Sequence, residues 1–138
     1  MTGNRNETAP DASEMPALHG SLLEGRNNPR SGLDYAVMLQ GTAPQSGCRV
    51  RLRYVPDKLL VDSGSFIDYL AALAPADQET PEMLALALLD DINNEIVPRW
   101  VQIAVSAEGC DTPVQTVILV DRQPNWDNPA ILGTLPPL

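Results

Sequence analysis

The feature that most constrains the fold is a central block, residues 54–97, in which two helical patterns lie between two pairs of strand patterns. The second helical pattern is the better marked. Thr80 is a natural N-cap, Pro81 suits the first helical position, and Pro98 ends the pattern. Its apolar residues recur every four positions and so share one helix face. They are Leu84, Leu88, Ile92 and Ile96.

The first helical pattern is shorter. Its apolar stripe consists of Phe66, Tyr69, Leu70 and Leu73. Ser65 followed by Asp68 resembles a capping box, which predicts a helix start at this point. Pro75 disfavours helical backbone at the residue before it, so we expect the helix to end near Ala74.

Four alternating patterns predict strands. Residues 33–40 alternate between apolar and polar, and residues 48–55 place three arginines, Arg49, Arg51 and Arg53, on one face. The short loop 41–47 predicts that these two strands form an antiparallel hairpin. Residues 100–106 alternate again, whereas residues 114–120 are more continuously apolar. The continuous run predicts that the fourth strand is central or covered on both faces.

Together these patterns predict an α+β domain in which a four-stranded antiparallel sheet carries both helices on one face. The predicted order is strand, strand, helix, helix, strand, strand. We expect a mostly disordered N-terminal arm over residues 1–31, with Leu22 and Leu23 as a docking point, and a folded domain over 32–122. Residues 123–138 form a proline-rich tail, which we expect to contain no regular helix but to pack on this subunit or a neighbour.

Charge limits the partners of the chain. Acidic residues outnumber basic ones 18 to 9, so the formal net charge is -9. This excess disfavours nucleic acid and anionic membrane surfaces as partners. The sequence shows no apolar run of ~20 residues and no apolar region typical of a secretory signal, so we expect a cytoplasmic protein. The same compartment predicts that Cys48 and Cys110 are free thiols.

Several short strings stand in an order found in one enzyme family. They are Leu22-Leu23-Glu24, Asn28-Pro29, Tyr35, Tyr54-Val55-Pro56-Asp57-Lys58, the segment Val61 to Leu70, Glu82 placed eight residues before Asp90-Asp91, and Pro98-Arg99-Trp100. In these strings the chain resembles the 7-cyano-7-deazaguanine nitrile reductases of queuosine biosynthesis, which belong to the tunnelling-fold (T-fold) superfamily. The resemblance implies the T-fold, a homo-oligomer whose sheet edges pair into a barrel, and substrate binding by Glu82.

The chemical apparatus of that family is missing. Its nucleophilic cysteine stands in a Cys-Pro-x-Thr-Gly-Gln-Pro-Asp loop between the first two strands, where this chain has only Gly41 to Gly47. Gly64 and Ile67 replace two lysines linked to NADPH. The resemblance therefore implies neither an NADPH cofactor nor nitrile reduction.

Glu82 is the candidate ligand-binding residue. A carboxylate offers paired acceptors to adjacent N–H donors of a guanine-like or pterin-like ring. The alternative is an acidic residue that the helix dipole favours in a first turn. Glu82 is two positions from Leu84, or about 200° around a helix, so we expect it to face away from the core at a subunit interface.

Cys48 is the candidate catalytic residue, as a displaced nucleophile. A reactive thiolate needs a cation nearby, and Arg49 is adjacent in sequence. However, adjacent strand residues point to opposite faces, which favours a buried structural thiol. The arginine row either binds an anionic ligand or forms a solvated or inter-subunit face. Asp62, Asp90 and Asp91 match no metal-ligand spacing, so we expect no metal.

Three functions remain open. The first is a divergent nitrile-reductase-like protein that binds a purine- or pterin-like ring through Glu82 without NADPH-dependent nitrile reduction. The second is an enzyme with altered chemistry on a purine or pterin. The third is a non-catalytic structural or interaction oligomer. The sequence leaves open whether the chain is an enzyme, but it disfavours an active nitrile reductase.

Overall fold

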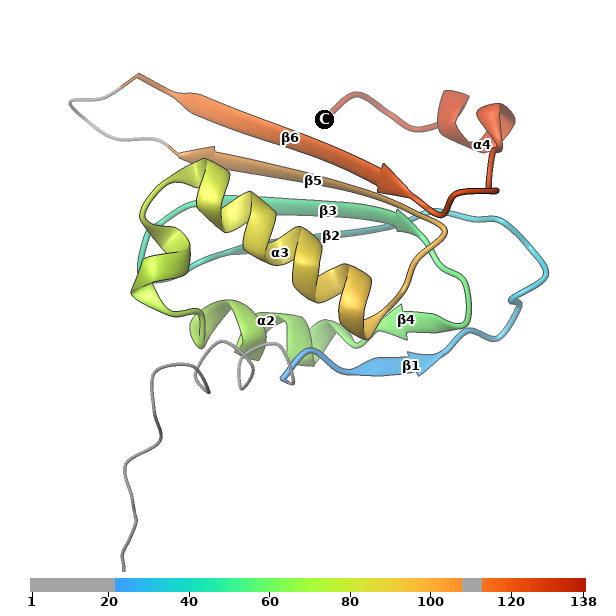
Figure 1. The fold of residues 1–138 in the computed structure, drawn as a ribbon, viewed down its shortest axis with the longest axis horizontal. Coiled ribbons are helices and arrows are strands. Elements are labelled where there is room, and N and C mark those ends of the chain that lie inside the picture. The colour runs from blue at the N-terminus through green and yellow to red at the C-terminus, as the bar shows by residue number, and fades with distance from the viewer. Residues whose placement is uncertain (1–21, 108–112) are drawn as a thin grey trace, which may run out of the picture.

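The computed structural model describes residues 22–107 and 113–138 (Figure 1). At its centre is a four-stranded antiparallel sheet with the strand order β2-β3-β5-β6. Its strands are β2 (Val37–Thr42), β3 (Arg49–Val55), β5 (Trp100–Ala107) and β6 (Gln115–Arg122). The predicted hairpin and the predicted α+β class with antiparallel strands are confirmed. Cys110, the second predicted free thiol, lies outside the described residues.

Two helices, α2 (Ser63–Ala71) and α3 (Pro81–Glu95), cover one face of this sheet, with a 3-10 turn, η1 (Pro75–Gln78), between them (Figure 1). The core lies between the helices and the sheet, where both predicted helical stripes are buried. A Cβ atom at Gly41 would lie 2.8 Å from the Leu70 Cδ1 atom, so glycine allows α2 to approach the β2 backbone closely. Within the described residues, no helix is long and apolar enough to cross a membrane.

Of the two predicted helix starts, that of α3 is confirmed and that of α2 is wrong. The Thr80 hydroxyl oxygen accepts a hydrogen bond from the Met83 N–H at 3.1 Å, which confirms the predicted cap of α3. The predicted capping box at Ser65 is wrong, because Asp62 caps α2 and accepts the Ser65 N–H at 3.0 Å. A carboxylate one turn earlier satisfies that donor. The Ser65 hydroxyl instead accepts a hydrogen bond from the Glu24 N–H at 2.9 Å and fixes the incoming chain.

The helix α2 also ends before the predicted Ala74. Its last helical residue is Ala71, and the Ala72 N–H donates to the carbonyl oxygens of both Asp68 and Tyr69. These shared bonds tighten the last turn. The chain then leaves the helix and buries Leu73 in the core.

A second, two-stranded sheet was not predicted. It pairs β1 (Gly25–Asn27) antiparallel with β4 (Leu59–Val61). Strands of three residues are too short to show a hydrophobic period. The described fold therefore includes residues before the predicted boundary at residue 32. Of the two predicted docking residues, Leu23 is buried, as predicted, whereas Leu22 is 42% exposed.

Two strand predictions need correction. The strand β6 is an edge strand, not a central one, and its outward residues Ile118 and Val120 are 51% and 55% exposed. Its apolar run therefore reflects one partly buried and one exposed apolar face. The first strand begins at Val37 instead of Leu33, whose side chain is 48% exposed.

The tail contains a short helix, α4 (Pro129–Gly133), although its prolines were expected to exclude one. Pro129 occupies the first turn, where an N–H group has no helical partner, so the missing donor costs nothing. The Asn128 side chain caps the turn by accepting the Ile131 N–H at 3.1 Å. Trp126 donates its indole N–H to Asp34 at 3.0 Å, so the tail packs on its own subunit.

Candidate functional site

Glu82 lies in the first turn of α3, and its side chain is exposed, as its angular offset from Leu84 predicted. The Gln115 side-chain amide, at the start of the edge strand β6, donates to Glu82 Oε2 at 2.8 Å. Within the described chain, Oε1 accepts no hydrogen bond. Free N–H groups of the first helical turn favour a negative charge here. The Glu82 carboxylate is therefore oriented by Gln115 and can accept further hydrogen bonds.

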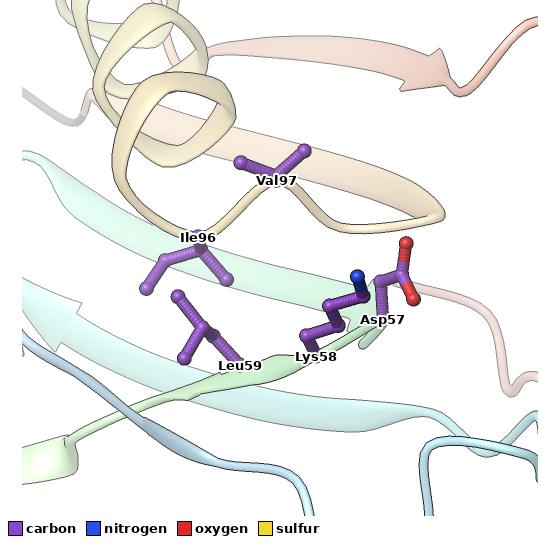
Figure 2. A pocket seen from close by; sticks show the side chains of 5 residues that line it. All are labelled: Asp57, Lys58, Leu59, Ile96 and Val97. Atoms are coloured by element: carbon purple, nitrogen blue, oxygen red, sulfur yellow. The ribbon is translucent and has the colours of Figure 1, made fainter.

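A cavity of about 280 Å³ lies at the other end of α3 (Figure 2). Its lining residues are Asp57, Lys58, Leu59, Ile96 and Val97. Fourteen helical positions separate Glu82 from Ile96, which corresponds to about 20 Å along the axis. This cavity therefore cannot enclose a small ring bound to Glu82, and a pocket at Glu82 needs walls from elsewhere.

Cys48 is a free cysteine that belongs to the hydrophobic core and is 5% exposed. It ends a tight turn in which its carbonyl oxygen accepts the Ala43 N–H at 2.9 Å. Gly47 has a φ of 75° in this turn, a conformation that glycine adopts without strain. Because Cys48 is buried and Glu82 is exposed, one subunit does not present both groups to one ligand.

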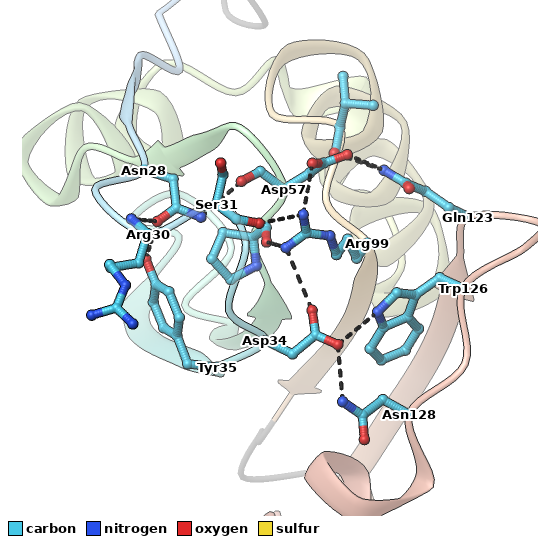
Figure 3. Close-up of polar contacts among 12 residues, drawn as sticks. Asn28, Arg30, Ser31, Asp34, Tyr35, Asp57, Arg99, Gln123, Trp126 and Asn128 are labelled. Atoms are coloured by element: carbon cyan, nitrogen blue, oxygen red, sulfur yellow. Dashed lines mark hydrogen bonds and ion pairs between the residues drawn. The ribbon is translucent and has the colours of Figure 1, made fainter.

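Four of the strings that carry the resemblance, those containing Asn28, Tyr35, Asp57 and Arg99, meet around Arg99 (Figure 3). Its guanidinium lies 3.2 Å from an Asp57 carboxylate oxygen and 3.4 Å from one of Asp34. It also donates to the carbonyl oxygens of Pro56 at 2.9 Å and Ser31 at 2.5 Å. We call Arg99, Asp34 and Asp57 the Arg99 clamp. The clamp joins the start of β5 to the loops before β2 and β4.

Neighbouring polar groups extend the Arg99 clamp (Figure 3). The Asn28 amide donates to the Asp57 carbonyl oxygen at 2.7 Å, and the Tyr35 hydroxyl donates to the Asn28 side-chain oxygen. Trp126 and Asn128 of the tail donate to the second carboxylate oxygen of Asp34. These contacts could not be predicted from the sequence, because they join residues far apart in the chain. These four strings therefore have a structural role in this molecule.

Asp91 is not simply the solvated helix carboxylate that was expected. The buried Tyr69 of α2 donates its hydroxyl to Asp91 of α3 at 2.6 Å. Burial, and then the hydrogen bond and charge of Asp91, raise the pKa of the Tyr69 phenol well above its usual value. Within residues 22–107 and 113–138, no group of three or more His, Cys, Asp or Glu side chains is arranged to hold a metal ion.

Fold and site thus define an α+β domain with an oriented acidic residue at one helix start and a structural clamp at the opposite end of the sheet. No protein-family model matches the chain. The sequence is similar to NADPH-dependent 7-cyano-7-deazaguanine reductases from two strains of Acidithiobacillus ferrooxidans. Each is 27% identical over 133 residues, which cover 88% of this chain and 92% of the relative. This similarity supports a distant relationship to those reductases.

Proposed function

We propose that this chain is a divergent relative of the nitrile reductases that binds a purine- or pterin-like ring through Glu82 and does not reduce nitriles with NADPH. The observation that carries the proposal is the oriented, exposed Glu82 carboxylate with one oxygen unpartnered within the described chain. Adjacent ring and amino N–H donors of a guanine-like ring match such a carboxylate.

A second subunit would complete the pocket. Glu82 is hydrogen-bonded to Gln115 on β6, whose outer edge is not paired within the described chain. A neighbouring subunit that pairs with this edge would bring its own residues beside Glu82. The T-fold barrel inferred from the resemblance has this arrangement, so we place the ring at a subunit interface.

Two features of the chain support the proposed absence of nitrile reduction with NADPH. In the reductase family a thiol adds to the nitrile carbon, whereas the Cys48 thiol here is in the hydrophobic core. Gly64 and Ile67, which stand in place of the NADPH-linked lysines, are both exposed on α2. This surface thus offers no cation at either position to the phosphates of NADPH.

Calorimetry with guanine, 7-deazaguanine and pterin tests the ring site. We expect the wild type to bind at least one ring and Glu82→Gln to bind it about 10- to 100-fold more weakly, because a hydrogen bond to a charged group contributes about 1.5–3 kcal/mol. Glu79→Gln is the matched control, since Glu79 is also exposed and loses the same charge. Absence of binding by the wild type, or equal binding by Glu82→Gln, would refute the role of Glu82.

A separate assay tests the chemistry. We expect no oxidation of NADPH that depends on 7-cyano-7-deazaguanine. Measurable oxidation would show that the chain is an active reductase, and loss of it in Cys48→Ala would identify the nucleophile. Such a result would not decide whether Glu82 binds a ring, because that question is answered by calorimetry alone.

A further inference from the structure

On the face of the main sheet opposite the helices, the charged residues of the strands are all basic. We call it the helix-free face, and the strand register defines its residues. They are Met38, Gln40, Thr42, Arg49, Arg51, Arg53, Val55, Trp100, Gln102, Ala104, Ser106, Thr116, Ile118, Val120 and Arg122. This set contains 4 of the chain's 9 basic residues and none of its 18 acidic ones. In a chain of net charge -9, this segregation indicates an anionic occupant.

The three arginines of β3 repel one another along this face. They stand at alternate positions, about 7 Å apart along the strand. Among the described residues, none of them forms an ion pair with an acidic side chain. The Arg51 Nε atom is buried and has no hydrogen-bond partner within the described chain. A buried guanidinium donor without an acceptor is costly unless an anion or water meets it.

The tail covers one end of the arginine row. Arg53 is 6% exposed, and it donates to the Gln102 side-chain oxygen and to the Pro136 carbonyl oxygen. Burial, and then the charge of Arg51, lower the pKa of Arg53. Pro137 and Leu138 line a small hollow of about 70 Å³ together with Arg51 and Arg53. This leaves the Arg49 end of the row open.

A larger hollow of about 310 Å³ lies at that open end. Its lining residues are Thr42, Gly47, Arg49 and Ser106. The Ser106 and Thr116 hydroxyl oxygens are 3.1 Å apart, and either can be the donor. One hydroxyl hydrogen serves that bond, so the other can donate to a ligand. The hollow thus combines a guanidinium group with hydroxyl donors, and the described residues that line it include no carboxylate.

We infer that this open end of the helix-free face binds a phosphate-type anion, held by Arg49 with hydroxyl groups of Thr42 and Ser106 and attracted by the neighbouring charge of Arg51. A guanidinium group presents a planar fork of donors that matches phosphate oxygens. The net negative charge of the chain does not exclude binding, because charges farther than about 8 Å are screened at physiological ionic strength. The site is independent of Glu82, which lies by the helix-covered face.

Thermal unfolding and calorimetry of the full chain test the site. Inorganic phosphate and phenyl phosphate are compared with sodium chloride at equal ionic strength. We expect either phosphate at 10 mM to raise the Tm of the wild type by several degrees above the chloride reference, as selective binding to the folded state requires. Tighter binding of phenyl phosphate would indicate a phosphate monoester as ligand, and equal binding would indicate inorganic phosphate.

Two variants distinguish loss of the phosphate site from loss of one positive charge. We expect Arg49→Gln to bind phosphate at least tenfold more weakly and Arg30→Gln to bind like the wild type, because both arginines are exposed and lose the same charge. If Arg49→Gln fails to fold, Arg49→Lys serves instead, with binding reduced several-fold by loss of the fork. No stabilisation by phosphate, or equal effects at both positions, would overturn the inference. A change of oligomeric mass in Arg49→Gln without phosphate binding would also overturn it and identify a second copy as the occupant.

Discussion

At the scale of single residues, Arg99 shows that strings which carry the resemblance to the reductases also hold this fold together. Arg99, Asp57 and Asn28 each come from a string that carries the resemblance, and they are joined through hydrogen bonds and an ion pair. Cys48 is packed in the core and lies outside this network. In this chain, these three strings therefore have a structural role, which is to join loops to the sheet.

The Arg99 clamp makes a testable contribution to stability. We expect Arg99→Ala to lower the free energy of unfolding by about 2–3 kcal/mol, because it leaves Asp34 and Asp57 without their cation and two carbonyl oxygens without a donor. The Arg99 side chain is 18% exposed, so some of the loss is offset by water. Urea unfolding monitored by circular dichroism measures the difference.

The control for this substitution is Arg26→Ala. Arg26 also faces a carboxylate, that of Asp62 at 3.6 Å, but its side chain is 69% exposed. A solvated pair of this kind contributes about 0–1 kcal/mol. Equal losses in the two variants would show that the Arg99 clamp is no more than a surface contact.

Tyr69 predicts how stability changes in alkali. Its folded pKa lies above the ordinary value of 10.0, so the folded phenol keeps its proton where the unfolded one loses it. The unfolded state then binds fewer protons, and the free energy of unfolding falls as pH rises above about 10, by up to about 1.4 kcal/mol per pH unit. We expect Tyr69→Phe to show a shallower fall between pH 10 and 11. The same slope in both proteins would contradict this account.

At the scale of elements, local chemistry was predictable and distant pairing was not. Thr80 and Pro81 fixed the start of α3 because a cap and its partner lie within one turn. The pairing of β1 with β4 joins short segments far apart in the chain, and neither has a period to detect. At the candidate site, the exposure of Glu82 followed from helix geometry, but its bond to Gln115 depends on tertiary structure.

The C-terminal end of α3 contains a strained residue. Val97 has a φ of 53°, in the left-handed region that disfavours β-branched side chains. Left-handed backbone costs a non-glycine residue about 1–2 kcal/mol, whereas added glycine entropy in the unfolded state costs about 0.4–1 kcal/mol. We therefore expect Val97→Gly to raise the free energy of unfolding by about 0.5–1 kcal/mol in urea.

Ile67→Gly is the control for Val97→Gly, because Ile67 has unstrained helical backbone. It is 65% exposed within α2, where helical backbone suits an ordinary residue. We expect Ile67→Gly to lower the free energy of unfolding by about 0.5–1 kcal/mol. If Val97→Gly were equally destabilising, side-chain contacts of Val97 at the cavity mouth would outweigh the backbone strain.

At the scale of the whole molecule, the two edges of the main sheet are the notable feature. The strands β2 and β6 each have one edge that is unpaired within the described chain. Edge strands expose N–H and C=O groups that favour pairing with another chain unless charged residues or proline protect them. The outward apolar residues Ile118 and Val120 leave β6 with little such protection. The edge is therefore suited to self-association.

We predict that the chain assembles through the edges of the main sheet, as the T-fold resemblance implies. Light scattering at micromolar concentration should give a mass that is a multiple of 14.9 kDa. The double substitution Ile118→Lys and Val120→Lys should reduce this mass, because lysine on an edge strand discourages pairing. Met83→Lys with Leu86→Lys is the matched control, since these side chains are 41% and 52% exposed on α3 and add the same charge. A wild-type mass of 14.9 kDa would exclude the assembly, and dissociation by the α3 variant alone would move the interface from the sheet edge to the helix.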